Sequence, residues 1–321
     1  MAVVVDPHQP GGLWAGFKDN GIFRSDDCGT TWRSTNGNAG FAVPDASPVS
    51  LAVDPVNPGV LYVAMYLGPL SIWKSTDGGL SWQDLFPSGH PIRNATEYNW
   101  WQSVRLDPKD PNHVVASTHG QCYAPYNEAC QIESLDAGAT WKIVRNPLVE
   151  NQQGGPWAEN GGSMALAPNL WLFSTPWGPM AGIWTSTDHG DNWVNVTPQG
   201  AGGMPGIWGT IPIPASDDNI YMPTENGMVR SKDGGFSWER IPNLSGRFVS
   251  MVTIGDRFVV SDQWSNNYRI GNVNDLSQWI TLPPPDGMPF DQGAVFLTYD
   301  ADNRVLYSSN FTGGLWRMVL P

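Results

Sequence analysis

Short apolar segments separated by turn residues run along the whole chain and predict β-strands. An apolar segment often ends in Asp-Pro and is followed by a Pro- or Gly-containing turn and a second apolar segment. The clearest examples are residues 2–17 (AVVVDPHQPGGLWAGF), 51–65 (LAVDPVNPGVLYVAM) and 104–117 (VRLDPKDPNHVVAS). Alternation with a period of two and many β-branched and aromatic residues are typical of strands. No segment shows a convincing helical period.

A turn motif of the form Ser-x-Asp-x-Gly-x-x-Trp follows the third predicted strand of five repeats. We call it the Ser-Asp-Gly-Trp motif. Its copies are SDDCGTTW (25–32), STDGGLSW (75–82), SLDAGATW (134–141), STDHGDNW (186–193) and SKDGGFSW (231–238). A decayed sixth copy, NVNDLSQW, ends at Trp279. The Trp residues of the intact copies are 50, 59, 52 and 45 positions apart, which indicates a repeat architecture.

The first strands of the repeats define seven units, and each unit except the last carries four short strands. The units begin near residues 2, 49, 102, 163, 209, 248 and 294. The last unit stops after its third strand, so its blade either has three strands or lacks one in this sequence. Four-stranded antiparallel units repeated about an axis form a propeller. We therefore predict an all-β fold, a seven-bladed β-propeller of four-stranded antiparallel blades, as one domain over residues 1–321.

The Ser-Asp-Gly-Trp motif resembles the Asp-box (BNR) repeat of sialidases, xyloglucanase-type glycoside hydrolases, sortilin-like receptors and some lectins. The resemblance covers nearly the whole chain, and it implies the fold more than one activity, because these relatives differ in chemistry. A turn is needed in every blade, whereas a catalytic site is needed once. We therefore assign the Asp residues of the motif to folding. They are Asp27, Asp77, Asp136, Asp188 and Asp233.

Strand order places the motif and the longest loops on opposite faces of the propeller. If the strands of a blade are numbered from the axis outward, the 1–2 and 3–4 turns lie on one face. The 2–3 loops and the links between blades lie on the other. We call these the motif face and the loop face. The Asp-box resemblance implies that an enzyme's site lies on the loop face, near the axis.

The segments of the loop face differ from blade to blade and carry Trp residues outside the repeat pattern, which favours one central pocket. Trp rings stack on sugar rings, while amide and charged groups bind hydroxyl groups. We expect at least half of these Trp residues, with Trp101 first, to pack between blades. The candidate substrate-binding residues are Trp100, Trp177, Trp208, Trp264, Asn160, Asn226, Gln263, Gln292, Lys18 and Arg93.

Glycoside hydrolysis is the activity that these residues favour, with a polysaccharide or oligosaccharide as the substrate. The reaction needs two carboxyl groups that flank one glycosidic bond in most families. Among the loop-face carboxylates we favour Glu159, Glu225 and Asp262, which adjoin strands near the axis. The resemblance to xyloglucanases is imperfect, because Lys18 stands where their catalytic Asp would align. A sialidase would need an arginine cluster, and Arg93 alone is evident in these loops.

Two other functions are compatible with the same face. A polysaccharide lyase would need a base for uronate β-elimination and a cation for the uronate carboxylate. His119 would be the base, with Tyr123 and Tyr126 nearby, and Lys18 or Arg93 would meet the carboxylate. The second alternative is a non-catalytic propeller that binds a glycan or a protein.

Charge and composition restrict the partners and the compartment. The net charge of −13 argues against nucleic acid, and no apolar run is long enough to span a membrane. Cys122 and Cys130 could form a disulfide or remain reduced, and Cys28 would be free. The chain begins in a strand, so we expect an extracellular monomer whose signal peptide has been removed, with a cytosolic protein as the alternative. No His/Cys spacing predicts a metal site, and no cofactor is expected.

Overall fold

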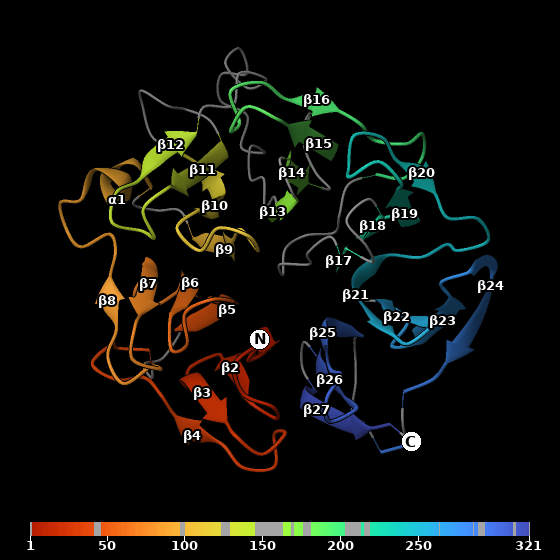
Figure 1. The fold of residues 1–321 in the computed structure, drawn as a ribbon, viewed down its shortest axis with the longest axis horizontal. Helices are drawn as coiled ribbons and strands as arrows, with labels where there is room; N and C mark the ends of the chain where they lie inside the picture. Colours follow the sequence, from red (N-terminus) through yellow and green to blue (C-terminus); the bar gives the residue numbers. More distant parts are fainter. Residues whose placement is uncertain are drawn as a thin grey trace.

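The computed structural model describes most of the chain. The described residues are 2–41, 46–96, 100–122, 129–144, 163–167, 170–175, 181–202, 213–214, 219–262, 264–284, 286–287, 293–310 and 313–320. They form seven sheets around a central axis, as Figure 1 shows. The predicted seven-bladed β-propeller is therefore confirmed.

Consecutive strands pair antiparallel in every blade, in the order of the sequence. Blade 1 contains β1 (Ala2–Val5), β2 (Leu13–Phe17), β3 (Gly21–Ser25) and β4 (Arg33–Ser34). Blade 2 contains β5 (Ser47–Val53), β6 (Leu61–Leu67), β7 (Ile72–Ser75) and β8 (Gln83–Asp84). Blade 3 contains β9 (Trp101–Leu106), β10 (Val114–Gln121), β11 (Ala129–Ser134) and β12 (Lys142–Val144). Blade 4 contains β13 (Ser163–Ala167), β14 (Leu170–Thr175), β15 (Gly182–Ser186) and β16 (Val194–Asn195).

The last three blades continue the same order, and the seventh has three strands among the described residues. Blade 5 contains β17 (Ile213–Pro214), β18 (Ile220–Thr224), β19 (Gly227–Ser231) and β20 (Glu239–Arg240). Blade 6 contains β21 (Phe248–Ile254), β22 (Arg257–Asp262), β23 (Tyr268–Asn272) and β24 (Asp275–Leu282). Blade 7 contains β25 (Ala294–Asp300), β26 (Val305–Asn310) and β27 (Gly314–Val319).

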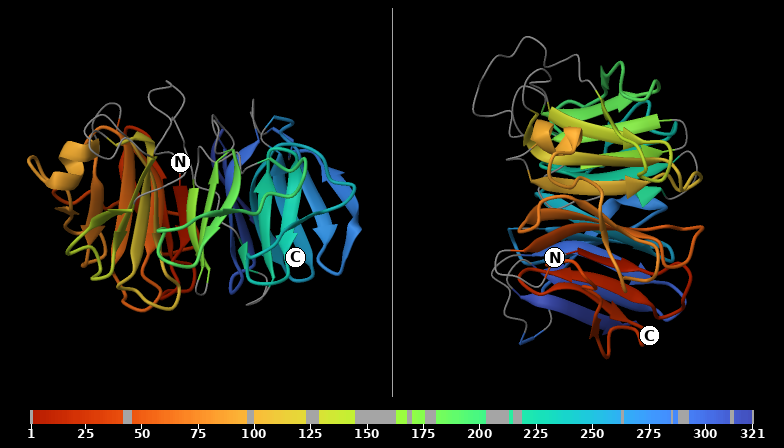
Figure 2. Two further views of the ribbon diagram at one scale, coloured as in Figure 1. Left: turned by 90° about the horizontal axis from the view of Figure 1, so that it is seen from above. Right: turned by 90° about the vertical axis from the view of Figure 1, so that its left-hand side faces the viewer.

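Apolar side chains of neighbouring blades pack together, so the core lies between the blades. Trp14 of blade 1 shares a buried cluster with Val63 of blade 2. The ring closes in the same way, because Val3 of blade 1 shares a cluster with Tyr307 of blade 7. In the side views of Figure 2 the blades stand next to one another, and their strand ends form two opposite faces.

One short helix departs from the expectation of strands alone. The helix α1 (Pro91–Thr96) lies in the link between blade 2 and blade 3. Pro at the first helical position is favourable, and the side chain of His90 accepts a hydrogen bond from the Ile92 amide at 3.2 Å. Six residues are too few to show a helical period in the sequence. Within the described residues, no helix has the length and apolarity needed to cross a bilayer.

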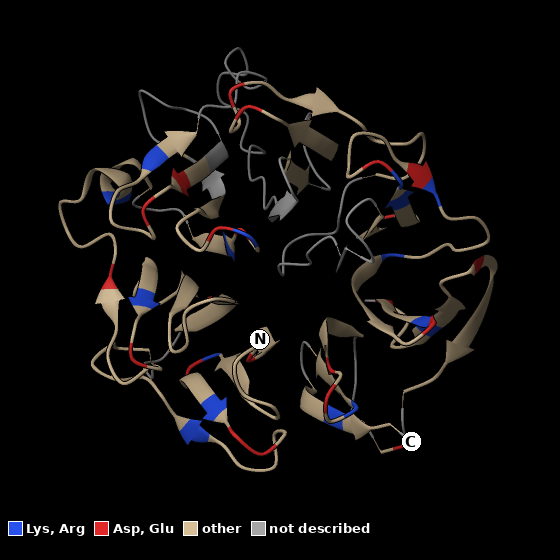
Figure 3. Ribbon diagram, viewed as in Figure 1, with Lys and Arg blue, Asp and Glu red and all other residues tan. Residues whose placement is uncertain are grey.

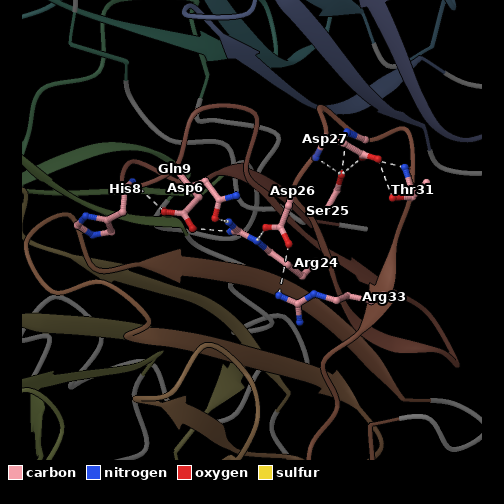
Figure 4. A network of polar contacts seen from close by, with 10 residues as sticks. Asp6, His8, Gln9, Arg24, Ser25, Asp26, Asp27, Thr31 and Arg33 are labelled. Carbon is pink, nitrogen blue, oxygen red and sulfur yellow. Dashed lines mark hydrogen bonds and ion pairs between the residues drawn. The ribbon is translucent and has the colours of Figure 1, made fainter.

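The Ser-Asp-Gly-Trp motif forms a turn in which the Asp carboxylate accepts hydrogen bonds from backbone amides of the same turn (Figure 4). In blade 1, Asp27 Oδ1 accepts from the amides of Thr30 at 3.0 Å and Thr31 at 2.8 Å. Ser25 Oγ accepts from the Gly29 amide at 2.8 Å. The hydrogen bonds from Thr31 hold the pKa of Asp27 at about 2. These contacts agree with the structural role predicted for the motif.

The other four intact copies make the same bonds. In each copy, Oδ1 of the motif Asp accepts a hydrogen bond from the backbone amide four positions later, at 2.7–2.9 Å. These Asp residues are Asp77, Asp136, Asp188 and Asp233. The pKa of Asp77, Asp136 and Asp188 is lowered mainly by the hydrogen bond from the side chain four positions later and then by the bond from its amide. At Asp233 burial would raise the pKa, but the hydrogen bonds from Ser237 and Ser231 outweigh it and lower the pKa.

Backbone hydrogen bonds confirm the assignment of the two faces. On the motif face, the motif turn contacts the 1–2 turn of its own blade, as in Cys28 N to Gly11 O at 2.9 Å. On the loop face, a 2–3 turn contacts a link between blades, as in Gly227 N to Gly246 O at 2.8 Å. The two sets of segments therefore occupy opposite ends of the strands.

The described cysteines differ in oxidation state. Cys122 is disulfide-bonded, which selects one of the two alternatives left open by the sequence. Cys28, in the motif turn of blade 1, is a free thiol, as predicted.

We expect acid to destabilise the fold because the motif carboxylates must then take up protons. The pKa of Asp27 is about 2 in the folded chain, and an unfolded Asp titrates near pH ~4. The unfolded state therefore binds more protons, so stability is complete above this window and is lost as the pH falls through it. Thermal unfolding followed by circular dichroism should show a midpoint that decreases between about pH 5 and about pH 2.

A double variant tests the origin of that decrease. Asp27→Asn/Asp77→Asn should unfold at a lower temperature at neutral pH and should lose less on acidification, since the amides do not titrate. Asp302→Asn, at an exposed position, is the control. An acid-induced decrease of the same size in the double variant and the parent would contradict the explanation.

Candidate functional site

Side chains from three loop-face segments meet between blade 5 and blade 6. Glu225 lies in the turn between β18 and β19, Arg247 directly precedes β21, and Trp264 follows β22. Arg247 Nε donates to Glu225 Oε1 at 2.9 Å and to Oε2 at 3.0 Å. The guanidinium carbon of Arg247 lies 5.1 Å from the ring centroid of Trp264. With Asp262, these residues form what we call the Arg247 cluster.

Asp262 is held at the end of β22 by its surroundings. Its side chain is buried, and Oδ1 accepts a hydrogen bond from the Trp264 amide at 3.2 Å. Gly246 lies beneath the carboxylate with a φ of 140°, and a Cβ there would be 3.1 Å from Asp262 Oδ2. The link that joins blade 5 to blade 6 can therefore pass close to this carboxylate because residue 246 is glycine.

Exposure differs sharply across the Arg247 cluster. Trp264 is 60% exposed, whereas the side chains of Arg247 and Glu225 are 11% and 25% exposed. The guanidinium of Arg247 lies over the indole of Trp264 and is itself held by Glu225, so the orientation of the indole at the surface is fixed. The cluster therefore presents one aromatic surface and the partly exposed carboxylate of Glu225, with the buried carboxylate of Asp262 next to them. This combination suits a sugar ring with its hydroxyl groups.

The structure brings together four of the residues predicted from the sequence. Glu225, Asp262 and Trp264 belong to the Arg247 cluster, and Asn226 is the exposed neighbour of Glu225. The backbone N–H of Asn226 donates to Ala201 O at 3.2 Å, in the link from blade 4.

Three other predicted residues lie elsewhere on the propeller. Trp100 packs on Tyr66, with ring centroids 4.6 Å apart, near the start of blade 3. Lys18 is exposed in the 2–3 turn of blade 1. Arg93 lies on α1 at the outer edge of the propeller (Figure 1), 3.5 Å from Asp84. These residues do not join the Arg247 cluster.

Trp101 behaves as the sequence analysis expects for a packing residue. It is 2% exposed, and its ring lies 5.2 Å from that of Phe86 in the core between blade 2 and blade 3.

Several predicted site residues lie outside the described part of the chain. They are Glu159, Asn160, Trp177, Trp208, Gln263 and Gln292. The backbone of His119 belongs to β10, but its side chain is outside the described part as well.

Arg247 is the residue that sequence reasoning missed. The long loops pointed to Arg93 as the cation, whereas Arg247 lies in the short segment between β20 and β21. Its signal was its position, because it follows a Gly in a link and directly precedes an apolar strand.

The described cations do not gather on one surface. Figure 3 shows the described Lys and Arg residues on separate blades, interspersed with Asp and Glu. The whole chain has 17 basic and 30 acidic residues. The described part therefore offers a phosphate backbone no continuous basic surface.

A cavity of about 890 Å³ lies between blade 6 and blade 7. Tyr268 and Ile270 of β23 line one side, and Leu306 of β26 and Met318 of β27 line the other. It is a space between two blades and does not correspond to the predicted pocket near the axis.

The chain is similar in sequence to xyloglucanases. An oligoxyloglucan-reducing end-specific xyloglucanase of Emericella nidulans is 25% identical over 285 residues, which are 83% of this chain and 32% of the relative. A xyloglucanase of Hypocrea jecorina is 26% identical over 290 residues, which are 83% of this chain and 31% of the relative. The chain spans about a third of the length of these curated relatives. No family model matches it.

Solved structures share the fold. The GH74 xyloglucanase from Xanthomonas campestris has a TM-score of 0.66 at 15% identity, over 99% of this chain and 51% of that chain. YCF48 from Cyanidioschyzon merolae has a TM-score of 0.65 at 12% identity, over 98% of this chain and 93% of that chain. These identities support a common fold and carry no further conclusion about function.

A double-mutant cycle would measure the coupling within the Arg247 cluster. We expect Arg247→Met and Glu225→Gln to be non-additive in the free energy of unfolding, with a coupling of about 1 kcal/mol for this partly buried pair. Chemical denaturation provides the measurement. Lys18→Met, at an exposed position, should change stability by less than about 0.5 kcal/mol. Additive effects of the two cluster substitutions would show that the ion pair contributes nothing.

Proposed function

We propose that this propeller belongs to a secreted glycoside hydrolase that acts on a xyloglucan-type polysaccharide or its oligosaccharides through the loop face. One observation carries the proposal: two carboxylates from different blades are both linked to Trp264, Glu225 through Arg247 and Asp262 through the Trp264 amide. The curated relatives are named as xyloglucanases, which supports this reaction class and this substrate. Because the chain spans about a third of those relatives, the activity of the whole protein is part of the proposal.

In this proposal, the residues of the Arg247 cluster have separate roles. Glu225 and Asp262 supply the two carboxyl groups that glycoside hydrolysis requires, with Glu159 as a third candidate. Trp264 stacks on a sugar ring, and Arg247 positions both Glu225 and Trp264. Asn226 offers its side-chain amide to a hydroxyl group. Trp100, on the same face at blade 3, is proposed as a second stacking position.

β-Elimination has less support than hydrolysis. The alternative depends on His119, whose side chain lies outside the described part. Arg93, one of the two cations proposed for the uronate carboxylate, lies at the outer edge on α1. The curated relatives reported above are hydrolases by name.

The proposal predicts release of reducing ends from xyloglucan, and none from polygalacturonate, when the chain is incubated with purified polysaccharides. Reducing ends would be measured together with the ultraviolet absorbance of unsaturated uronates. Glu225→Gln and Asp262→Asn should each lower kcat/KM about 100-fold or more if they act in acid–base catalysis. Trp264→Ala should mainly raise KM, because it removes a stacking surface.

Asp302→Asn is the matched control, since it removes an exposed carboxylate on the motif face. Unchanged activity in both cluster variants would refute the roles of Glu225 and Asp262. Saturable binding of xyloglucan without reducing ends would replace the hydrolase with a glycan-binding propeller. The ultraviolet absorbance of unsaturated uronates from polygalacturonate, without cleavage of xyloglucan, would favour the lyase.

A protein-binding function is the second candidate, and the outer strand of blade 7 favours it. Among the described strands, β27 pairs with β26 alone. It exposes Met318 (43%) and Val319 (67%) next to the cavity between blade 6 and blade 7. An extended peptide can add to such an edge through backbone hydrogen bonds.

A peptide array tests this candidate. Specific binding should weaken at least tenfold in Met318→Lys and should persist in Asp302→Asn. The candidate fails if no peptide binds, or if Met318→Lys binds as well as the parent.

A further inference from the structure

Two histidines and a buried glutamate meet on the motif face, between blade 3 and blade 4. His113 lies in the 1–2 turn of blade 3, Glu133 in β11, and His189 in the motif turn of blade 4. Glu133 Oε1 lies 3.0 Å from His113 Nε2 and 2.7 Å from His189 Nδ1. One ligand atom of each residue lies within 4.8 Å of the other two. All three residues are remote from the Arg247 cluster, which lies on the opposite face.

The repeat itself shows that this cluster is unusual. The position before the motif Ser is basic in three blades, where it holds Arg24, Lys74 and Arg230, and it is Thr185 in blade 4. In blade 1, Arg24 is buried between Asp6, Gln9 and Asp26 (Figure 4), and the two carboxylates neutralise its charge. In blade 3 the position is Glu133, so the charge is reversed.

The second departure from the repeat is His189, the residue of blade 4 that contacts Glu133. The residue after the motif Asp is Cys28, Gly78, Ala137 or Gly234 in the other intact copies, and it is His189 in blade 4. Small residues thus suffice for this turn, whose φ is 55° at Ala137 and 56° at His189. Folding of the turn does not require a histidine. Two independent departures from the repeat face one another across the boundary between blades.

The environment of His113 indicates that a cation fits between these side chains. His113 Nδ1 lies 3.3 Å from Asp107 Oδ2, so this nitrogen can donate to a carboxylate. The neutral ring then directs the lone pair of Nε2 towards Glu133 Oε1, which is also an acceptor. His113 Nε2 is buried 3.0 Å from Glu133 Oε1. Burial would lower the pKa of His113, but the hydrogen bonds to Glu133 and Asp107 raise it, so in the absence of a metal a proton can occupy this nitrogen and a metal ion would replace that proton. A carboxylate that orients a histidine in this way is a common feature of metal sites.

We propose that His113, Glu133 and His189 bind a divalent transition-metal ion of the Zn²⁺ class and thereby join blade 3 to blade 4. Two imidazoles and one carboxylate form a ligand set that suits Zn²⁺. Tetrahedral bonds of about 2.0–2.1 Å place ligand atoms ~3.4 Å apart. The two spacings from Glu133 Oε1, 2.7 and 3.0 Å, need to widen by less than one ångström. The ligand atoms lie within 4.8 Å of one another, so the two histidine nitrogens need to move closer together.

Two exposed side chains allow that adjustment. The side chain of His189 is 54% exposed and can shift without disturbing the core. Lys142, whose Nζ lies 2.6 Å from Glu133 Oε2, is also 54% exposed, so its ammonium can withdraw into water. Without metal, Lys142 is the cation that neutralises the buried Glu133. The metal and Lys142 therefore compete for the same carboxylate.

Calorimetric titration of the chelator-treated full chain with ZnCl₂ tests the proposal. We expect one Zn²⁺ to bind per chain, with a rise in the midpoint of thermal unfolding. His189→Ala should weaken binding at least tenfold, and it should fold, since Ala137 occupies the same motif position in blade 3. His8→Ala removes a histidine from the 1–2 turn of blade 1 and should bind Zn²⁺ like the parent.

A further variant supplies a readout in the opposite direction. Lys142→Met removes the competing ammonium and should bind Zn²⁺ more tightly than the parent. Co²⁺ should give the visible spectrum of a tetrahedral site in the parent and lose it in His189→Ala. The proposal is overturned if the parent does not bind Zn²⁺, if His189→Ala binds equally well, or if His8→Ala loses as much affinity.

Discussion

The hydrogen bonds that each motif Asp accepts from its own turn are the constraint on which the outer parts of the blades depend. In blades 1, 2, 4 and 5 the outer strand has two residues, too few for a stable ladder by itself. The motif turn fixes the direction in which that strand leaves β3 or its equivalent. Blade 6 shows the converse. Its motif is decayed, and its outer strand β24 has eight residues, so a longer ladder replaces the missing turn bonds.

Some of these turns also contact a neighbouring blade. The indole of Trp82, in the motif of blade 2, donates a hydrogen bond at 2.7 Å to Thr35 O in the link that leaves blade 1. The ring closes on the motif face through Arg317 Nη1, which donates to Cys28 O at 3.0 Å. The seventh blade can therefore be held by packing and by such contacts, although its described part has three strands.

Local patterns made the fold predictable from the sequence, whereas the sites depend on contacts between distant segments. The period of the motif and the alternation of apolar residues predicted seven blades and the two faces, because each signal lies within one repeat. Glu225, Asp262 and Trp264 were identified because strand order places their turns on the loop face. Arg247 was not, since its pairing with Glu225 spans 22 positions and leaves no local pattern. The contact between Glu133 and His189 spans 56 positions and was missed for the same reason.

The repeat also provides a reference against which function can be recognised. On the motif face, contacts recur from blade to blade, so a departure such as Glu133 stands out against four other copies of the same position. On the loop face there is no such reference, because every link and 2–3 loop differs. Function there must be argued from geometry. The Arg247 cluster draws its residues from two adjacent blades, so a sugar that it binds needs to contact only one sector of the propeller. In the proposed function, that geometry places the substrate across the boundary between blade 5 and blade 6, where Gly246 brings the link close to Asp262.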